Sequence, residues 1–277
     1  MAKKKNTDQM SFLDHLEELR WLLVRSAIGI LIMASATFFV SDYIFDEIIF
    51  GPVHPEFITY RLFCEVSQFF GVDGLCVTEF PFVIQNTDME GQISMLIWTC
   101  VTAGFILAFP YILYLIWSFV GPALYDKEKK NAKLFIFISS ILFFIGVLFG
   151  YFIIVPLSVN FFATFTISDV IKNEFNLSSY ISMIKTSVLA TGLLFELPIV
   201  IYFLARLGLV TAEFLRKYRK YAIVIILLVA AIVTPPDVIS QIIVSIPILL
   251  IYEVSIFIAA AVVKKQLKDA KQSPRIQ

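Results

Sequence analysis

Long apolar stretches, separated by short polar segments, dominate the pattern of hydrophobic and polar positions along the chain. Several of these stretches exceed the roughly 18 apolar residues that mark a membrane-spanning helix. The pattern therefore predicts an all-α membrane protein with six transmembrane helices. The predicted spans are 21–45, 92–120, 134–157, 180–207, 222–234 and 238–263.

The fifth of these segments is short for a membrane span. At about 1.5 Å per residue, a helix over 222–234 reaches only ~20 Å, against a hydrocarbon core of ~30 Å. Flanking residues can extend the helix, or the bilayer can thin around it. The alternative is a re-entrant hairpin made by the fifth and sixth segments. Strong positive charge lies before the fifth segment and after the sixth, and it favours two full spans.

Composition supports a membrane protein. Hydrophobic residues make up 59% of the 277 residues and charged residues 16%, with a mean hydropathy of +0.85. Soluble domains are nearer 45–50% apolar and about 25% charged. The formal net charge is zero, so overall charge indicates no nucleic-acid partner. The first apolar segment is too long for a signal-peptide core, and no small-residue cleavage site follows, so we expect the N-terminus to be retained.

Lysine and arginine are distributed very unevenly, which predicts the orientation in the membrane. Nineteen of the 22 basic residues lie in the N-terminal segment, the loops after the second and fourth spans, and the C-terminal tail. Only Arg61, Lys172 and Lys185 lie elsewhere. We therefore predict that both termini are cytoplasmic, that 264–277 is a cytoplasmic tail, and that 46–91 and 158–179 lie outside.

The first outer segment, 46–91, is long, acidic and rich in aromatic residues. A bare linker has no need of that aromatic content, so we predict a folded extracytoplasmic cap loop. The segment contains Cys64 and Cys76, whereas Cys100 lies in the second span. An outer location is oxidising, and we predict a disulfide between the two loop cysteines; two free buried thiols are the alternative.

Residues for catalysis or metal binding are not grouped in any recognisable way. The chain has two histidines, His15 and His54, and no pair of acids with metal-ligand spacing in an apolar setting. It also has no glycine-rich phosphate loop and no nucleophile elbow. We therefore predict a protein that is not an enzyme and that needs no cofactor or metal ion.

Glu196 lies inside the fourth predicted span, in the stretch TGLLFELPIVIYF. A charge in the middle of a membrane costs about 2.5–3.5 kcal/mol or more, and such residues commonly face a cavity or a partner. A glutamate bonded only to its own helix is the alternative, but Pro198 also disturbs the backbone nearby. Glu253, nearer the cytoplasmic end of the sixth span, can snorkel to the interface.

Three further segments carry polar residues near the spans. In HLEELR, residues 15–20, Glu18 belongs to an acidic row that requires either solvent or a cationic partner. Glu128 stands among lysines in FVGPALYDKEKK, residues 119–130. On chemistry alone, a solvated interfacial helix and a positive-inside loop are the simpler interpretations.

The third segment is TPPDVISQ, residues 234–241. Pro235 and Pro236 exclude helix and predict a tight outer turn, with Asp237 as N-cap of the sixth span. Gln241 then lies one turn inside that span and has no role in the turn itself.

Together these stretches resemble the TatC family, the multi-spanning receptor subunit of the twin-arginine protein translocase. The residues that carry the resemblance are HLEELR, FVGPALYDKEKK, LLFELPI (193–199) and TPPDVISQ, in this order and on six spans with both termini inside. The resemblance covers nearly the whole chain. It implies a cup-shaped six-helix receptor that binds twin-arginine signal peptides of folded cargo on its cytoplasmic side.

The resemblance also implies partners and site residues. The partners would be TatA- and TatB-type single-span proteins and further copies of the chain within the receptor complex, in the bacterial inner membrane and driven by the proton-motive force. Signal-peptide binding would fall to Glu18, Arg20, Phe119 and Glu128. Partner binding within the membrane would fall to Glu196 and to Gln241, the polar residue near it. Pro235, Pro236 and Asp237, with Thr234 before them, would form the outer tip.

Two other functions remain open at this point. A proton-coupled secondary transporter would use Glu196 as its proton carrier, although such folds usually show paired broken helices and no second segment resembles LLFELPIV. A membrane scaffold would use its polar residues only to hold neighbouring helices together. Retention of twin-arginine cargo after deletion of the protein would distinguish a translocase from both alternatives.

Overall fold

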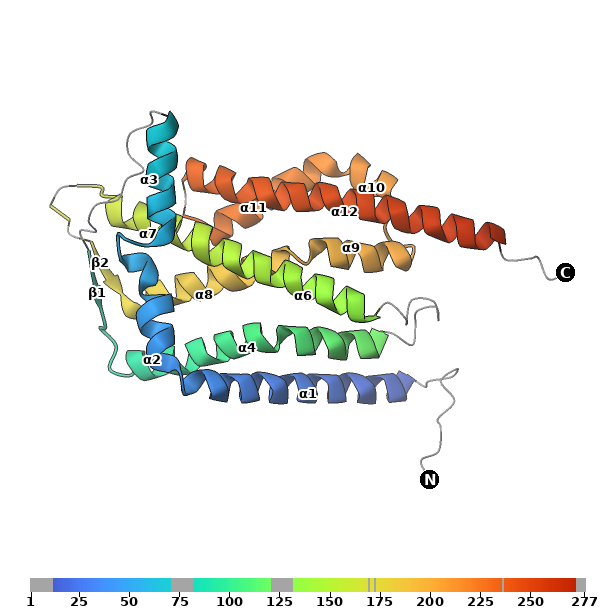
Figure 1. Cartoon of the computed structure of the whole chain (residues 1–277), viewed down its shortest axis with the longest axis horizontal. Coiled ribbons are helices and arrows are strands. Elements are labelled where there is room, and N and C mark those ends of the chain that lie inside the picture. The colour runs from blue at the N-terminus through green and yellow to red at the C-terminus, as the bar shows by residue number, and fades with distance from the viewer. Residues whose placement is uncertain are drawn as a thin grey trace, which may run out of the picture. The chain divides into compact units, whose positions relative to one another are not determined.

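The computed structural model describes residues 12–70, 82–120, 132–168, 170–171, 173–235 and 237–272. These residues are helical almost throughout (Figure 1). The helices are α1 (Phe12–Phe38), α2 (Ser41–Tyr43), α3 (Ile58–Phe70), α4 (Gly91–Val120), α6 (Ala132–Phe149), α7 (Val155–Thr164), α8 (Leu177–Leu194), α9 (Leu197–Arg206), α10 (Ala212–Lys217), α11 (Arg219–Val233) and α12 (Val238–Gln272). Short π-helical turns at Ile44–Ile49 and Gly150–Ile154 and a 3₁₀ turn at Gly51–Val53 connect some of them.

The chain forms two compact units, which are described separately. The first comprises residues 1–48 and 86–141, and the second comprises 49–85 and 142–277. Five helical stretches among the described residues are long and apolar enough to cross a membrane: Leu16–Phe38, Gly91–Phe119, Lys133–Thr164, Leu177–Arg206 and Ser240–Gln266. At 15 residues, α11 is shorter than these stretches, so its role as the sixth span stays a prediction.

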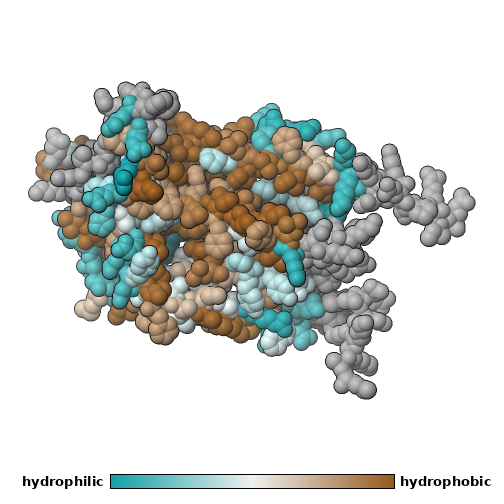
Figure 2. Space-filling model, viewed as in Figure 1, coloured by the Kyte–Doolittle hydropathy of each residue, from teal (hydrophilic) through white to brown (hydrophobic). Residues whose placement is uncertain are grey.

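The surfaces of these helices are apolar where a soluble protein would be polar. Leu31 on α1, Phe137 on α6 and Ile232 on α11 expose 61, 62 and 79% of their surface. In Figure 2, apolar side chains cover much of the visible face of the helices, and polar ones gather toward the helix ends. Exposed apolar surface on this scale requires a nonpolar solvent, which is the interior of a bilayer.

In the first unit, α1 and α4 run antiparallel and touch along their lengths (Figure 1). Gly29 lies against the Tyr111 ring, Gly104 against the Ala34 backbone, and Thr37 Oγ1 donates to the Cys100 carbonyl at 3.1 Å. Small residues of this kind let membrane helices approach closely, where van der Waals contacts hold them together.

Gly104 is the tightest point of this contact and gives a stability prediction. A Cβ at this position would lie 2.6 Å from the Ala34 nitrogen, and backbone at that distance cannot yield cheaply. Gly104→Ala is therefore expected to lower the free energy of unfolding by about 1–3 kcal/mol, the usual cost of overpacking. Thermal unfolding in detergent micelles measures the effect. Leu107→Ala, at a side chain that is 50% exposed on the same helix, is the control. Equal stability of the two variants would contradict the prediction.

The core of the second unit surrounds α12. Val244, Ile248 and Ile256 of α12 are almost completely buried, together with Ala205 of α9 and Ala230 of α11. In another part of this unit, α8 lies close to the π-helical turn Gly150–Ile154. A Cβ at Gly150 would meet Thr191 Oγ1 of α8. Close contact at glycine again brings two spans together.

The described parts of 49–85, which are residues 49–70 and 82–85, pack against the rest of the second unit and do not form a bare linker. Tyr60 of α3 donates to the carbonyls of Pro52 at 2.8 Å and Pro156 at 3.3 Å, and burial raises its pKa. Thr59 Oγ1 donates to the Phe152 carbonyl at 2.6 Å, and β1 (Val83–Gln85) pairs in parallel with β2 (Glu174–Asn176). These contacts tie the first outer segment to the second.

Several element boundaries differ from the predicted spans. The first helix ends at Phe38 rather than continuing to residue 45, and polar Ser41 and Asp42 begin the next short helix. The third span continues through the π-helical turn to Thr164, beyond the predicted end at 157. The fourth is interrupted by a turn at Phe195 and Glu196, because Pro198 occupies the second position of α9, where its missing N–H is tolerated.

Candidate functional site

Glu196 lies in the turn between α8 and α9. Its residue is 7% exposed, and its carbonyl accepts hydrogen bonds from Ile199 N at 2.9 Å and Val200 N at 3.0 Å. The preceding residue, Phe195, is buried and its ring lies 5.7 Å from that of Phe149. The break in the helix thus places a buried, carboxyl-bearing residue within the membrane-spanning part of the second unit.

Asp237 caps α12, as predicted. Its Oδ2 accepts from Ser240 N at 2.7 Å, which satisfies one of the free amides at the helix start. Pro235 before it is buried, and Pro236 lies outside the described residues. One turn into the helix, Gln241 Nε2 donates to the Leu227 carbonyl of α11 at 3.1 Å. This bond gives Gln241 a structural role in joining α11 to α12, and its predicted proximity to Glu196 stays a prediction.

The residues predicted to bind the signal peptide belong to the first unit. Glu18 and Arg20 lie on the first turns of α1 and are exposed, and Phe119 is half-buried near the end of α4. Glu128 lies outside the described residues.

The register of α1 on α4 determines which residues share one end of this unit. Thr37 lies opposite Cys100, Ala34 opposite Gly104 and Gly29 opposite Tyr111. Continued along two antiparallel helices, this register carries Glu18 to the level of the C-terminal end of α4. This register brings Glu18 and Arg20 to the same end of the unit as Phe119, and the segment that contains Glu128 follows α4 in the sequence. Figure 1 shows the start of α1 and the end of α4 side by side.

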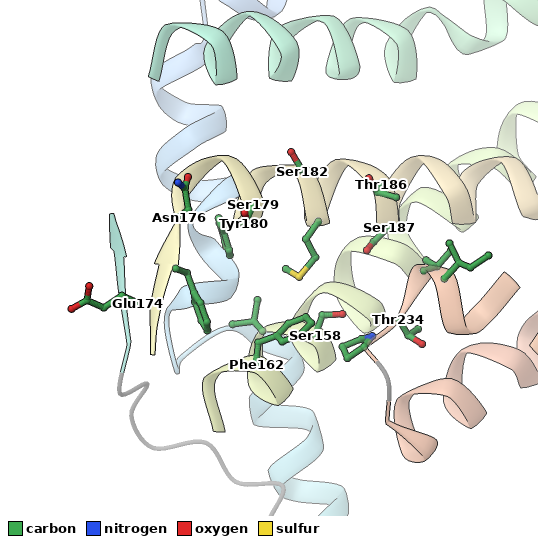
Figure 3. A pocket seen from close by; sticks show the side chains of 16 residues that line it. Ser158, Phe162, Glu174, Asn176, Ser179, Tyr180, Ser182, Thr186, Ser187 and Thr234 are labelled. Atoms are coloured by element: carbon green, nitrogen blue, oxygen red, sulfur yellow. The ribbon is translucent and has the colours of Figure 1, made fainter. Parts of the chain in front are cut away.

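A cavity of about 700 Å³ in the second unit was not anticipated from the sequence (Figure 3). It is lined by α7, β2, α8 and the end of α11, and includes Thr234 and Pro235 of the predicted outer tip. Ser158, Ser187 and Thr234 lie around it in Figure 3, and Ser158 Oγ is buried without a hydrogen-bond partner among the described residues. Polar groups on membrane helices commonly bond across to other helices, so the cavity can receive polar groups of a partner.

The signal for this cavity is present in the sequence. Ser179, Ser182 and Thr186 recur at a spacing of three or four residues on α8, and Ser187 follows directly, which makes one polar stripe on this span. Each residue alone is an ordinary component of a helix, and only the packing of α7 and α11 against this stripe encloses a space.

The outer cysteines are only partly described. Cys64 lies in α3 and is disulfide-bonded, and Cys100 is a free, buried thiol. Cys76 lies outside the described residues, so its pairing with Cys64 stays a prediction. Within the described residues, no group of three or more His, Cys, Asp or Glu side chains could hold a metal ion.

The long apolar helices and their exposed apolar faces define a multi-pass α-helical membrane protein. Residues 14–247 match the family described as Sec-independent protein translocase protein (TatC). The chain belongs to this family, and the resemblance found in the sequence is confirmed.

Similar proteins cover the chain almost completely. The chain is 43% identical to the TatC protein of Blattabacterium sp. subsp. Periplaneta americana, over 95% of this chain and 100% of that protein. It is 35% identical to the TatC protein of Aquifex aeolicus, again over 95% and 100%. Its fold is similar to the crystal structure of a twin-arginine translocase receptor, TatC, with a TM-score of 0.69 and 34% identity over 90% of this chain and 99% of that one.

Proposed function

We propose that this protein is the receptor subunit of a twin-arginine translocase and binds the twin-arginine signal peptides of folded proteins. Its family is a family of translocase components. The observation that supports the proposal is the register of α1 on α4, in which Glu18 and Arg20 lie level with Phe119 near the C-terminal end of α4. Acidic groups on two separate chain segments can then pair with two adjacent arginines.

The partners follow from the same proposal. TatA- and TatB-type single-span proteins would bind within the membrane, where Glu196 and the polar stripe of α8 offer hydrogen-bonding groups. We expect several copies of the chain in one receptor complex, in the bacterial inner membrane. Transport would draw on the proton-motive force and not on nucleotide hydrolysis. Membership of a translocase family argues against the proton-coupled transporter.

Crosslinking tests the receptor function directly. A photo-reactive amino acid at position 18 or 119 should crosslink to the signal peptide of a twin-arginine precursor in membranes. The same photo-reactive amino acid at position 107, an exposed position earlier in α4, should not crosslink to the signal peptide. Deletion of the protein should leave twin-arginine cargo in the cytoplasm. If cargo is exported normally in the deletion strain, the proposed function is wrong.

The predicted topology requires opposite accessibility of two exposed positions. Glu56, before α3, should lie outside, and Lys265, near the end of α12, should lie in the cytoplasm. We expect Glu56→Cys to react with a membrane-impermeant maleimide in intact spheroplasts, and Lys265→Cys to react only after the membrane is opened. Labelling of Lys265→Cys in intact spheroplasts would overturn the orientation.

A further inference from the structure

Basic and aromatic side chains alternate at the joint between α10 and α11. The basic members are Arg216, Lys217 and Lys220, and the aromatic members are Phe214, Tyr218 and Tyr221. All six side chains are exposed. We call this set the basic–aromatic joint.

The three aromatic rings of the joint form a continuous row. The Phe214 and Tyr218 ring centroids are 4.6 Å apart, and those of Tyr218 and Tyr221 are 5.9 Å apart. The lysines lie over this row, with Lys217 Nζ 6.0 Å from the Tyr218 ring and Lys220 Nζ 5.3 Å from the Tyr221 ring. Contact with the electron-rich ring faces keeps both ammonium groups beside the rings.

Two consecutive residues of α12 hold the joint in place. Tyr252 donates from its hydroxyl to the Leu215 carbonyl at 2.8 Å, and the Leu215 side chain is buried in the core of the unit. Glu253 pairs with Arg219 at 2.8 Å. This ion pair gives Glu253 a partner within the protein and neutralises Arg219. Arg216, Lys217 and Lys220 are left as the outward cations of the joint.

The joint also marks a sharp boundary between charged and apolar surface. Immediately after it, Val224, Ile225 and Leu228 of α11 are 55, 59 and 61% exposed. Side chains that are this apolar and this exposed belong in the hydrocarbon of the bilayer, so the joint lies at the level of the lipid headgroups. Tyrosine is enriched at that level, because its ring is apolar and its hydroxyl is polar.

We propose that the basic–aromatic joint is a binding site for the phosphate headgroup of an anionic phospholipid. Charge complementarity selects this ligand: three cations face outward, while Glu253 is occupied by Arg219 and the exposed Glu213 lies at the start of α10, before the aromatic row. Basic side chains near a membrane surface attract anionic lipid. By the predicted orientation, the site faces the cytoplasmic leaflet. The proposal does not depend on the receptor function.

Lipid titration of the purified full-length protein tests the site. Native mass spectrometry would follow the binding of phosphatidylglycerol to the wild type and to Lys217→Gln/Lys220→Gln. Each lysine contributes about five-fold in affinity, so we expect the double variant to bind about 25-fold more weakly. Because both side chains are exposed and make no ion pair that the structure records, the thermal stability of the variant in detergent should stay unchanged.

Two controls make the test specific. Lys264→Gln/Lys265→Gln removes two exposed lysines from α12, and phosphatidylcholine removes the net charge from the lipid. The proposal requires that the control variant bind phosphatidylglycerol as the wild type does, and that neither protein variant change phosphatidylcholine binding. Equal losses in both double variants would overturn it, because the attraction would then come from general positive charge. Displacement of the lipid by millimolar inorganic phosphate would also overturn it, because the site would then bind a free anion.

Discussion

Replacing Glu18 and Glu128 together by alanine is expected to abolish measurable binding of a twin-arginine signal peptide. An arginine guanidinium pairs with a carboxylate through two parallel hydrogen bonds, and a hydrogen bond to a charged group contributes about 1.5–3 kcal/mol. Each single substitution should therefore weaken binding by about 10-fold to 100-fold, and the double substitution by more. Binding to the purified receptor in nanodiscs, measured with a fluorescent signal peptide, gives the affinity.

Glu17 supplies the matched control for this experiment. It is exposed, carries the same charge and precedes Glu18 on α1, but it points about 100° away around the helix. Glu17→Ala should bind the peptide nearly as the wild type does. Insertion of all variants into the membrane should be normal, because in the sequence Glu17 and Glu18 precede the buried contacts between α1 and α4 and Glu128 follows them. Unchanged binding by the double variant would remove Glu18 and Glu128 from the receptor site.

The same geometry predicts how the receptor distinguishes arginine from lysine. A lysine ammonium group is a point charge and cannot donate two parallel hydrogen bonds to both oxygens of a carboxylate, as a planar guanidinium does. A signal peptide with two lysines should therefore bind the wild type more weakly than the arginine peptide. This preference should be smaller in Glu18→Ala, because one of the two carboxylates that can pair with an arginine is then missing.

Much of the helical architecture could be predicted because apolar length and charge placement are local properties of the sequence. The break at Phe195 and Glu196 followed from Pro198, which is a strong local signal. The end of α1 at Phe38 did not, because residues 39–45 remain largely apolar and contain no glycine or proline. Helix boundaries inside an apolar stretch depend on what the neighbouring elements contact, and the sequence does not show those contacts.

Contacts between distant segments were the least predictable part. The pairing of β1 with β2 joins two strands of three residues each, separated by about 90 residues, and neither strand has a pattern long enough to detect. Likewise, Gln241 was expected near Glu196, and its recorded bond is to the Leu227 carbonyl. The type of side chain indicated that it needed a partner in the membrane, but only packing determined which partner it found.

Glu196→Gln is expected to support transport, whereas Glu196→Ala should impair it. Glu196 is buried in the turn between α8 and α9, with its residue 7% exposed, so whatever it binds is shielded from water. A glutamine keeps a hydrogen-bond acceptor and offers donors in nearly the same volume, while alanine offers neither. Interhelical hydrogen bonds in membranes contribute about 0.6–2 kcal/mol each. Loss of one bond should therefore weaken partner recruitment by about 3-fold to 30-fold, enough to slow assembly without unfolding the receptor.

Export of a twin-arginine reporter and co-purification of the single-span partners would measure the two steps separately. Glu253→Gln is the matched control, because it neutralises a second carboxylate within the spans, one whose recorded partner is Arg219 on the receptor itself. It should leave recruitment intact. A group that carries protons must titrate, and neither glutamine nor alanine can do so. If Glu196→Gln stops export as completely as Glu196→Ala, hydrogen bonding is not the role of Glu196, and proton transfer through its carboxyl group takes its place.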